Sequence, residues 1–324
     1  MFDTRTEMRK MRMTARSVQR RARRLGRLRP PRLEFPYRAP TVPKAAGPVP
    51  KPEGRGVDYD TDWARTDFAR VVRAAAVESI VRPTVRVLAQ PERIGLDRLD
   101  DIDGPVIFAA NHHSHLDTPL IATSIPAHLR HHLVVGAAAD YFFSNPVTSA
   151  ASALFVGAIP IERSKVGRTS ADEAARILDE GWSLLIYPEG GRSPDGWAQE
   201  FRGGAAYLAL RCGVPVIPVH LSGTGRILRK GSLLPRPART TVAFGAPVVA
   251  DDGERSRGLA TRIEIAVSSL ADEVATDWWQ ARRRFHAGDV PSMSGPAAAS
   301  WRRAWQLGSR DRSRRNRRPA WPRI

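Results

Sequence analysis

Apolar residues recur along the middle of the chain in two patterns, which predict two kinds of secondary-structure element. Short continuous apolar runs lie at residues 106–110, 133–137, 182–187, 214–221 and 240–244. Runs of this length without polar alternation are typical of strands that are buried on both faces. Residues 170–180 and 257–285 have helical spacing, with Ser170 as a candidate N-cap. This alternation predicts a single α/β domain with a mostly parallel or mixed central sheet flanked by helices.

Two further stretches are apolar but do not fit the strand pattern. Residues 61–81 are amphipathic with helical spacing, and Pro83 is the residue expected to end that helix. Residues 141–161 form the longest run without a charged side chain, long enough to span a bilayer. Several polar residues and a proline dilute this run, so we interpret it as buried core.

Charge divides the chain into three parts. Residues 1–57 carry 16 Lys/Arg against 4 Asp/Glu, residues 301–324 carry 9 against 1, and residues 58–300 sum to −2. We therefore predict a basic, Pro-rich N-terminal tail and linker (1–57), a folded domain (58–287) and an Arg/Trp-rich C-terminal tail (288–324). Basic tails of this kind seek polyanions, either nucleic acid or an anionic membrane surface.

The N-terminal region has the spacing of a basic amphipathic helix over residues 3–28, which is typical of a helix lying on an anionic bilayer. A disordered arginine-rich tail is an equally good interpretation. The basic stretch is not followed by an apolar segment, so no signal peptide is expected. Cys212 is the single cysteine, which excludes a disulfide within the chain and fits a reducing cytoplasm.

The segment NHHSHLDTP, residues 111–119, concentrates three histidines and an aspartate directly after the run 106–110. Open α/β sheets place ligands at the carboxyl ends of their strands. If a helix begins near Leu116, His112 lies in the loop and Asp117 in the first helical turn. A carboxylate there can hold one imidazole nitrogen and leave the other free as a base. His112 and Asp117 are therefore candidate catalytic residues, with ordinary polar loop residues as the alternative.

A second polar segment, YPEGGRSPDG at residues 187–196, also follows an apolar run. Its glycines let backbone N–H groups approach a ligand closely, and Arg192 could grip a phosphate with two hydrogen bonds. A surface turn has the same composition. The segment GAIPIERS at 157–164 places Arg163 after another apolar run, whereas VPVIPV at 214–219 is expected to be sheet core.

These four segments together resemble, in order, the sequence blocks of the glycerolipid acyltransferases, the family of 1-acylglycerol-3-phosphate acyltransferases. NHHSHLD is similar to their N-H-x-S-x-x-D block, GAIPIER to Gly-x-x-Phe-Ile-x-Arg, YPEGGRS to Phe-Pro-Glu-Gly-Thr-Arg-Ser, and VPVIPV to the fourth block. With flanking structure the resemblance covers roughly residues 85–285. Pro160 replaces a usual Phe, and Gly191 replaces a usual Thr whose hydroxyl could touch the acceptor, which leaves the exact acceptor open.

The resemblance implies an O-acyltransferase of phospholipid biosynthesis that converts 1-acyl-glycerol-3-phosphate to phosphatidic acid. His112 would be the general base on the acceptor hydroxyl, and Asp117 would orient it and stabilise the imidazolium. The resemblance also implies a set of substrate-binding residues: Arg163, Glu189, Gly190, Gly191, Arg192, Asn111 and Ser114. Within this set, Asn111 and Ser114 would support the loop. No cofactor and no metal are expected, and the acyl donor is a thioester co-substrate, either acyl-CoA or acyl carrier protein.

Other interpretations compete with this one. His112, His113 and Asp117 also fit an H-H-x-x-x-D pattern, which resembles the condensation-type CoA-dependent acyltransferases and would make His113 the base. That pattern usually continues with Gly, whereas this chain has Thr118, and the folded part is short for a two-lobed architecture.

A zinc site and a nucleic-acid-binding protein are the remaining alternatives. A zinc ion could be bound by histidines from two parts of the chain, namely His112, His115, His131 and His132. However, these residues do not have the spacing that is usual for zinc ligands. Arginine tails bind phosphate backbones without sequence preference, and tryptophans interleave the C-terminal tail. We expect no specific nucleic-acid partner. We expect instead a peripheral protein on the cytoplasmic face of the membrane, held by the basic tails and by the helix at 61–81.

Overall fold

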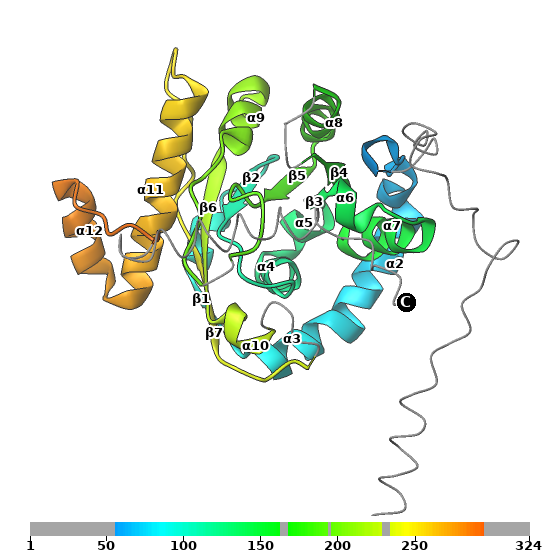
Figure 1. Ribbon diagram of the computed structural model, residues 1–324, viewed down its shortest axis with the longest axis horizontal. Helices are drawn as coiled ribbons and strands as arrows, with labels where there is room; N and C mark the ends of the chain where they lie inside the picture. The colour runs from blue at the N-terminus through cyan, green and yellow to red at the C-terminus, as the bar shows by residue number, and fades with distance from the viewer. Residues whose placement is uncertain (1–55, 163–167, 194–195, 229–233, 295–324) are drawn as a thin grey trace, which may run out of the picture. The chain divides into compact units, whose positions relative to one another are not determined.

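A seven-stranded sheet forms the centre of the part of the chain that the computed structural model describes, residues 56–162, 168–193, 196–228 and 234–294 (Figure 1). The strands are β1 (Pro91–Ile94), β2 (Ile107–Ala110), β3 (Leu133–Ala138), β4 (Ala158–Ile161), β5 (Ser183–Ile186), β6 (Val216–Ser222) and β7 (Thr240–Phe244). Their order across the sheet is β1-β7-β6-β2-β5-β3-β4. Neighbouring strands are parallel except β6 and β7, which are antiparallel. The predicted α/β domain with a mixed central sheet is confirmed.

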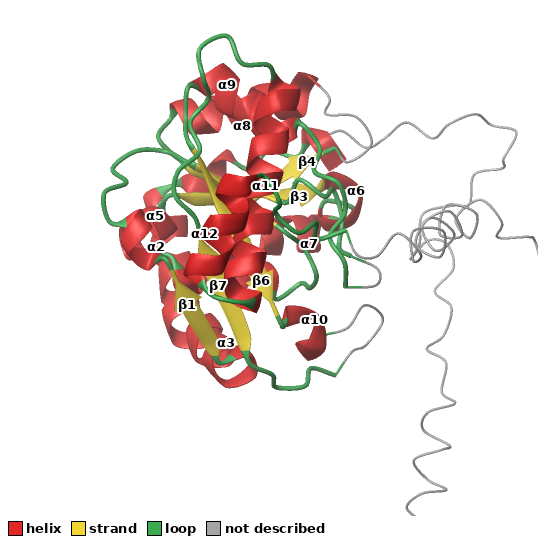
Figure 2. Ribbon diagram, turned by 90° about the vertical axis from the view of Figure 1, so that its left-hand side faces the viewer, coloured by secondary structure: helices red, strands yellow, loops and turns green. Residues whose placement is uncertain are grey.

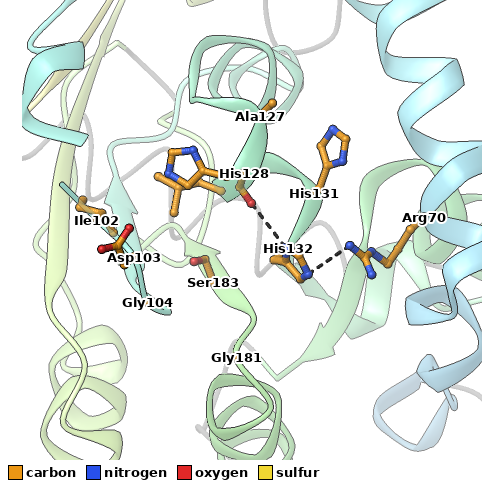
Figure 3. A pocket seen from close by; sticks show the side chains of 11 residues that line it. Arg70, Ile102, Asp103, Gly104, Ala127, His128, His131, His132, Gly181 and Ser183 are labelled. Carbon is orange, nitrogen blue, oxygen red and sulfur yellow. Dashed lines mark hydrogen bonds between the residues drawn. The ribbon is translucent and has the colours of Figure 1, made fainter. Parts of the chain in front are cut away.

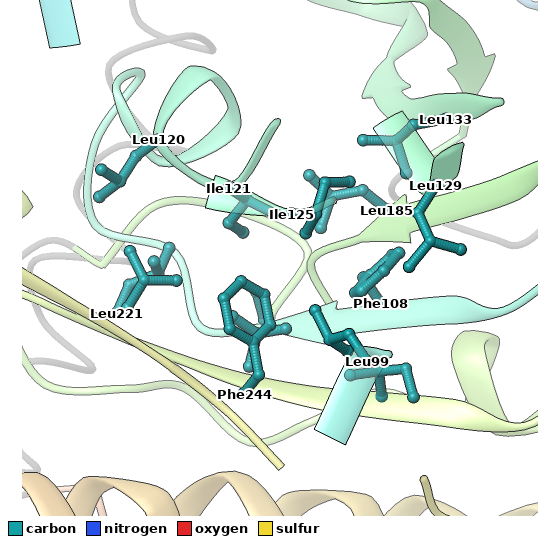
Figure 4. Packing of buried hydrophobic residues seen from close by; sticks show 14 of the residues in the cluster. Leu99, Phe108, Leu120, Ile121, Ile125, Leu129, Leu133, Leu185, Leu221 and Phe244 are labelled. Atoms are coloured by element: carbon teal, nitrogen blue, oxygen red, sulfur yellow. The ribbon is translucent and has the colours of Figure 1, made fainter. Parts of the chain in front are cut away.

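Helices cover both faces of this sheet (Figures 1 and 2). On one face, Phe108 of β2 packs with Leu120 and Phe244 (Figure 4). The helices that contribute to this core include α3 (Arg82–Ala89), α4 (Asp117–Ser124), α5 (Ala127–His131) and α10 (Thr224–Ile227). On the other face, Ile107 packs with Ile263 in a second core, built with α8 (Arg168–Asp179), α9 (Gly204–Cys212) and α11 (Ser256–Ala275). Because successive side chains of a strand point to opposite faces, only a continuous apolar run fits between two such layers.

The five apolar runs predicted as strands are confirmed as β2, β3, β5, β6 and β7. The run 214–219 lies in the sheet core as predicted, with Val216 and Ile217 completely buried. Strand β1 was not predicted, because Glu92 and Arg93 interrupt its apolar pattern. It lies at the edge of the sheet and, among the described strands, pairs with β7 alone, so exposed polar side chains are tolerated there.

The N-terminal helical run extends beyond its predicted end. It consists of η3 (Asp62–Arg65), α2 (Asp67–Ala76), a π-helical turn η4 (Val77–Val81) and α3. The prediction that Pro83 ends the helix is wrong, because Pro83 lies in the first turn of α3 and the run continues to Ala89. A wide π-helical turn precedes the proline, and in it the N–H of Arg82 donates a hydrogen bond to the carbonyl of Val77. This wider turn makes room for the proline ring within the helical run.

The uncharged run 141–161 is not uniformly buried core, and that prediction is wrong for its helical part. The run covers the end of α6 (Ala139–Phe142), α7 (Pro146–Ala151), the π-helical η6 (Ser152–Val156) and β4. Val147 is 78% exposed, and Tyr141 and Phe155 are also exposed, whereas β4 is mostly buried. A run without charges shows only that burial is permitted. Here β4 and single residues outside it, such as Phe143 and Ala153, are buried, whereas several of the other side chains are exposed.

Two helix boundaries also differ from prediction. Residues 257–285 form two helices, α11 and α12 (Trp278–Ala287), since Asp277 has extended backbone and its side chain accepts a hydrogen bond from the N–H of Gln280 as an N-cap. Ser170 is not the N-cap of α8, because that helix already begins at Arg168. Its hydroxyl instead accepts a 3.4 Å hydrogen bond from the N–H of Glu162. The helix predicted over 3–28, nearly all of the linker and most of the C-terminal tail lie outside the described residues.

Candidate active site

The histidine loop connects the carboxyl end of β2 to α4, which begins at Asp117, one residue after the start considered from the sequence. His112 Nδ1 lies 2.9 Å from Asp117 Oδ2. The same oxygen accepts hydrogen bonds from the backbone N–H groups of His113 at 2.6 Å and Ser114 at 2.8 Å. The Asp117 side chain is completely buried. The carboxylate therefore shapes the loop and holds the imidazole with a single oxygen.

This geometry assigns the tautomer of His112. A carboxylate oxygen accepts hydrogen bonds, so the proton of the neutral imidazole lies on Nδ1 and Nε2 carries the lone pair. The His112 side chain keeps 17% of its surface exposed, while its carboxylate partner has none. The pair thus has the arrangement of a histidine base oriented by a buried carboxylate.

Glu189 ties this loop to the segment that follows β5. Its Oε1 accepts the backbone N–H of His112 at 2.8 Å, and its Oε2 accepts the backbone N–H of Gln199 at 2.9 Å. The Glu189 residue is 2% exposed. A second link joins the two segments, since the N–H of Ser193 donates to the carbonyl of His112 at 2.7 Å. Both Glu189 oxygens thus face backbone, in the geometry of a clamp that fixes the position of His112.

Asn111 and Ser114 fasten the other side of the histidine loop. The Asn111 side chain exchanges two hydrogen bonds with the backbone of Leu221 in β6, at 2.7 and 2.9 Å. The Ser114 hydroxyl accepts the N–H of Leu116 at 3.3 Å and donates to the carbonyl of Leu228 at 3.4 Å. Through these contacts both residues tie the histidine loop to the chain around it.

The glycine segment brings an arginine that the sequence analysis did not single out. Gly190 has φ of +69°, and a side chain at this position would meet the guanidinium of Arg202 at 2.9 Å. Arg202 therefore packs directly on the loop that holds Glu189, while Gly191 borders open space. Arg192 lies in the same loop and is half-buried. Arg163 lies outside the described residues.

Tyr187 is a second residue that the sequence analysis did not single out. Its ring stacks on the His112 imidazole, with centroids 4.0 Å apart and planes inclined by 20°. Its hydroxyl lies 2.9 Å from the hydroxyl of Thr118 in α4. Burial, and then the Asp117 carboxylate, raise the pKa of Tyr187 well above its ordinary value, although the hydrogen bond with Thr118 opposes them. The phenol is therefore neutral. No local pattern signals this stack, because it depends on β5 lying beside β2.

The competing base, His113, has different surroundings. Its Nε2 lies 2.8 Å from the side-chain nitrogen of Asn111, and only its backbone N–H contacts Asp117. His115 stacks against Tyr141 instead, with ring centroids 5.9 Å apart. Of the three histidines, His112 is thus the one whose ring is paired with the buried carboxylate.

The other histidines named for a zinc site lie elsewhere. His131 and His132 precede β3 and line a hollow of about 380 Å³, with His128, Arg70 and Ser183 (Figure 3). Ser183 begins β5, so this hollow lies at the amino ends of parallel strands, whereas His112 lies beyond their carboxyl ends. These histidines therefore cannot share one metal with His112. Among the described residues no group of three or more His, Cys, Asp or Glu side chains could hold a metal ion.

Comparisons with known proteins find similarity to acyltransferases. Residues 86–222 match the family model described as Acyltransferase. The chain is 33% identical over 141 residues to the chloroplastic 1-acyl-sn-glycerol-3-phosphate acyltransferase of Brassica napus, covering 43% of this chain and 39% of the relative. It is 33% identical over 119 residues to the beta form of human 1-acyl-sn-glycerol-3-phosphate acyltransferase, covering 36% and 41%. The chain thus spans under half the length of these relatives.

A solved structure shares the fold. The crystal structure of the 1-acyl-sn-glycerophosphate acyltransferase of Thermotoga maritima superposes with a TM-score of 0.54 at 23% sequence identity. The match covers 68% of this chain and 85% of the other. At this identity the likeness shows a common fold, and the histidine loop and glycine segment carry the chemical argument.

Proposed function

We infer that this chain, whose residues 86–222 match the Acyltransferase family model, transfers a fatty acyl group from an acyl thioester to the hydroxyl of 1-acyl-glycerol-3-phosphate. The product would be phosphatidic acid. The observation that carries the inference is the pairing of His112 with the buried Asp117 at the carboxyl end of β2. A base held in this way activates an alcohol. The relatives' names specify 1-acyl-sn-glycerol-3-phosphate, which is such an alcohol.

The proposed reaction needs a single base and no covalent enzyme intermediate. His112 Nε2 takes the proton of the acceptor hydroxyl as its oxygen attacks the thioester carbonyl. The new C–O bond forms, the C–S bond breaks, and the imidazolium returns the proton to the leaving thiolate. Asp117 stabilises the imidazolium between these steps. A positioned base of this kind contributes roughly 10²–10⁴ in rate.

Cations near the glycine segment would hold the acceptor phosphate. Arg192 lies in this loop, and Arg202 packs on Gly190. Arg163, which the sequence analysis named, is the third candidate. Phosphate oxygens suit guanidinium groups, which can donate two parallel hydrogen bonds. Anchoring the phosphate here would bring the acceptor hydroxyl toward His112. The binding of the phosphate would then orient the hydroxyl for the reaction. The geometry of Glu189 favours a supporting role over a direct substrate contact.

Radiolabelled acyl transfer to a panel of glycerol-phosphate and lysolipid acceptors tests the proposal, with acyl-CoA and acyl carrier protein as donors. We expect His112→Ala to abolish transfer, with His113→Ala as the matched control that retains most of it. Inactivation by His113→Ala alone would favour the condensation-type mechanism. Absence of transfer with both donors and every acceptor would refute the proposed activity.

We also propose that the enzyme works as a peripheral protein on the cytoplasmic face of the membrane. No helix in the described part of the chain is long and apolar enough to cross a bilayer. However, the run from α2 to α3 exposes a series of apolar side chains, with Phe68 at 81% and Val87 at 66%, together with Val71 and Ile80. Exposed apolar groups on one helical run are typical of surfaces that enter a membrane interface.

Liposome co-sedimentation tests this location. Phe68→Ser with Val71→Ser should weaken binding to anionic vesicles, whereas Val249→Ser, which is also exposed but lies after β7, is the matched control. Deletion of residues 1–57 and 301–324 should weaken binding further and reduce its salt dependence. Unchanged binding after both changes would refute the proposed attachment. Tighter binding to RNA of equal charge would favour the nucleic-acid alternative.

A further inference from the structure

Tyr187 occupies a position that connects three parts of the site. Its backbone directly follows β5, its ring lies on the imidazole of His112, and its hydroxyl contacts Thr118. Since β5 pairs with β2 in parallel, with Ala109 opposite Ile186, the residues that follow the two strands leave the sheet side by side. The ring is thus held at both ends, by the strand at its backbone and by α4 at its hydroxyl.

The hydrogen bond to Asp117 alone does not fix the imidazole. It restrains Nδ1, but the ring can still tilt about that contact and move Nε2. A flat ring 4.0 Å away and nearly parallel removes this freedom on one face. The Thr118 hydroxyl, one residue from the carboxylate, keeps the phenol ring in register with the same helix. The three contacts together define where Nε2 points.

We propose that Tyr187 is a positioning residue for the base His112: its ring fixes the tilt of the imidazole, and its hydroxyl bond to Thr118 fixes the ring itself. This role rests on the proposed acyl transfer, in which Nε2 must meet the acceptor hydroxyl. The aromatic face also stabilises the imidazolium that forms during the reaction, because a cation is attracted to the ring face. The related sequence block usually has Phe at this position, which would keep the stack but lack the hydroxyl.

The ring of Tyr187 and its hydroxyl can be tested separately, by two different substitutions. Tyr187→Phe keeps the ring and removes the hydroxyl, so kcat should fall by about 3-fold, in proportion to one lost neutral hydrogen bond. Tyr187→Leu removes the flat ring, and kcat should fall by about 10- to 100-fold because small displacements of a base are costly. KM for the acceptor should stay within about 2-fold in both, since Tyr187 orients the base and does not hold the phosphate.

Thr118→Val provides the matched test of the hydroxyl bond. It removes the other partner, so it should reproduce the effect of Tyr187→Phe. The double variant should be no worse than either single variant, because both remove the same interaction. Additive losses would show that the two hydroxyls act separately, which would overturn the proposed link.

A spectroscopic measurement keeps the test independent of turnover. The Nδ1 proton of His112, bonded to Asp117, should give a downfield NMR signal in the full-length protein, identified by its loss in His112→Ala. We expect a sharp signal in wild type and Tyr187→Phe, and a broadened or missing signal in folded Tyr187→Leu, with folding checked by thermal unfolding. If wild type transfers no acyl group, the proposed function fails while this signal still tests the positioning role. An unchanged signal together with wild-type kcat in Tyr187→Leu would overturn the inference.

Discussion

Replacing Glu189 with glutamine separates two roles that this residue could have. The substitution keeps the size of the side chain and replaces one carboxylate oxygen by an NH₂ group. In the structure both oxygens accept backbone N–H groups, one from His112 at 2.8 Å and one from Gln199 at 2.9 Å. An amide can accept only one of these bonds, and its NH₂ group must then face the other N–H.

The size of the effect follows from burial. Glu189 is 2% exposed, so water cannot replace the lost acceptor. One buried N–H without a partner costs about 1–3 kcal/mol, and the surviving bond loses its charge assistance, for a total of about 2–4 kcal/mol. At about 2–4 °C per kcal/mol, the midpoint of thermal unfolding should fall by roughly 4–16 °C. Either orientation of the amide releases one of the two backbone anchors of Glu189, so the position of His112 is less well fixed and kcat should also fall, by up to about 10²-fold for a displacement near 1 Å.

Thermal unfolding and initial rates against acceptor concentration measure both quantities. Glu200→Gln is the matched control, because it makes the same chemical change at an exposed carboxylate in the same segment. A clamp predicts lower stability and lower kcat with little change in KM. A raised KM with unchanged stability would show that Glu189 contacts the substrate and would refute the clamp.

Three further predictions concern the same loops and the partly buried His220. Gly190→Ala should lower stability by about 1–2 kcal/mol because its φ is +69°, whereas Gly191→Ala, in open space, should not; equal unfolding midpoints would contradict the backbone argument. Asp117→Asn should lower kcat by about 10²–10⁴-fold while acceptor binding persists, and near-normal turnover would exclude its orienting role. Burial, and then His113, lower the pKa of His220 to about 3. Its unfolded state therefore takes up a proton at higher pH than the native state, and stability falls as pH drops below about 6.5, by about 1.4 kcal/mol per unit. His220→Gln should flatten this slope in denaturant titrations between about pH 6 and pH 4, and an unchanged slope would contradict it.

Sequence patterns located the strands better than the helix boundaries. A continuous apolar run such as 106–110 has few alternatives to burial between two layers, and the structure confirms it as β2. Helix limits depend on weaker competing terms. Pro83 was expected to end a helix, but a π turn before it absorbs the proline. Asp277, with no proline or glycine beside it, divides the predicted C-terminal helix. Interactions worth about 1 kcal/mol each, such as an N-cap hydrogen bond, decide where a helix ends. The local sequence does not reveal which of these interactions prevails.

The sequence by itself determined the chemical groups of the site and their place at strand ends. His112 and Asp117 lie close together in the chain, so the loop and the start of α4 bring them together by local geometry. Tertiary structure alone decided what surrounds that pair. Glu189 binds the N–H of His112 from 77 positions away, and Tyr187 covers its ring, because β5 pairs with β2. Strand order is set by burial of both sheet faces across the whole domain, so no local pattern encodes which loops become neighbours.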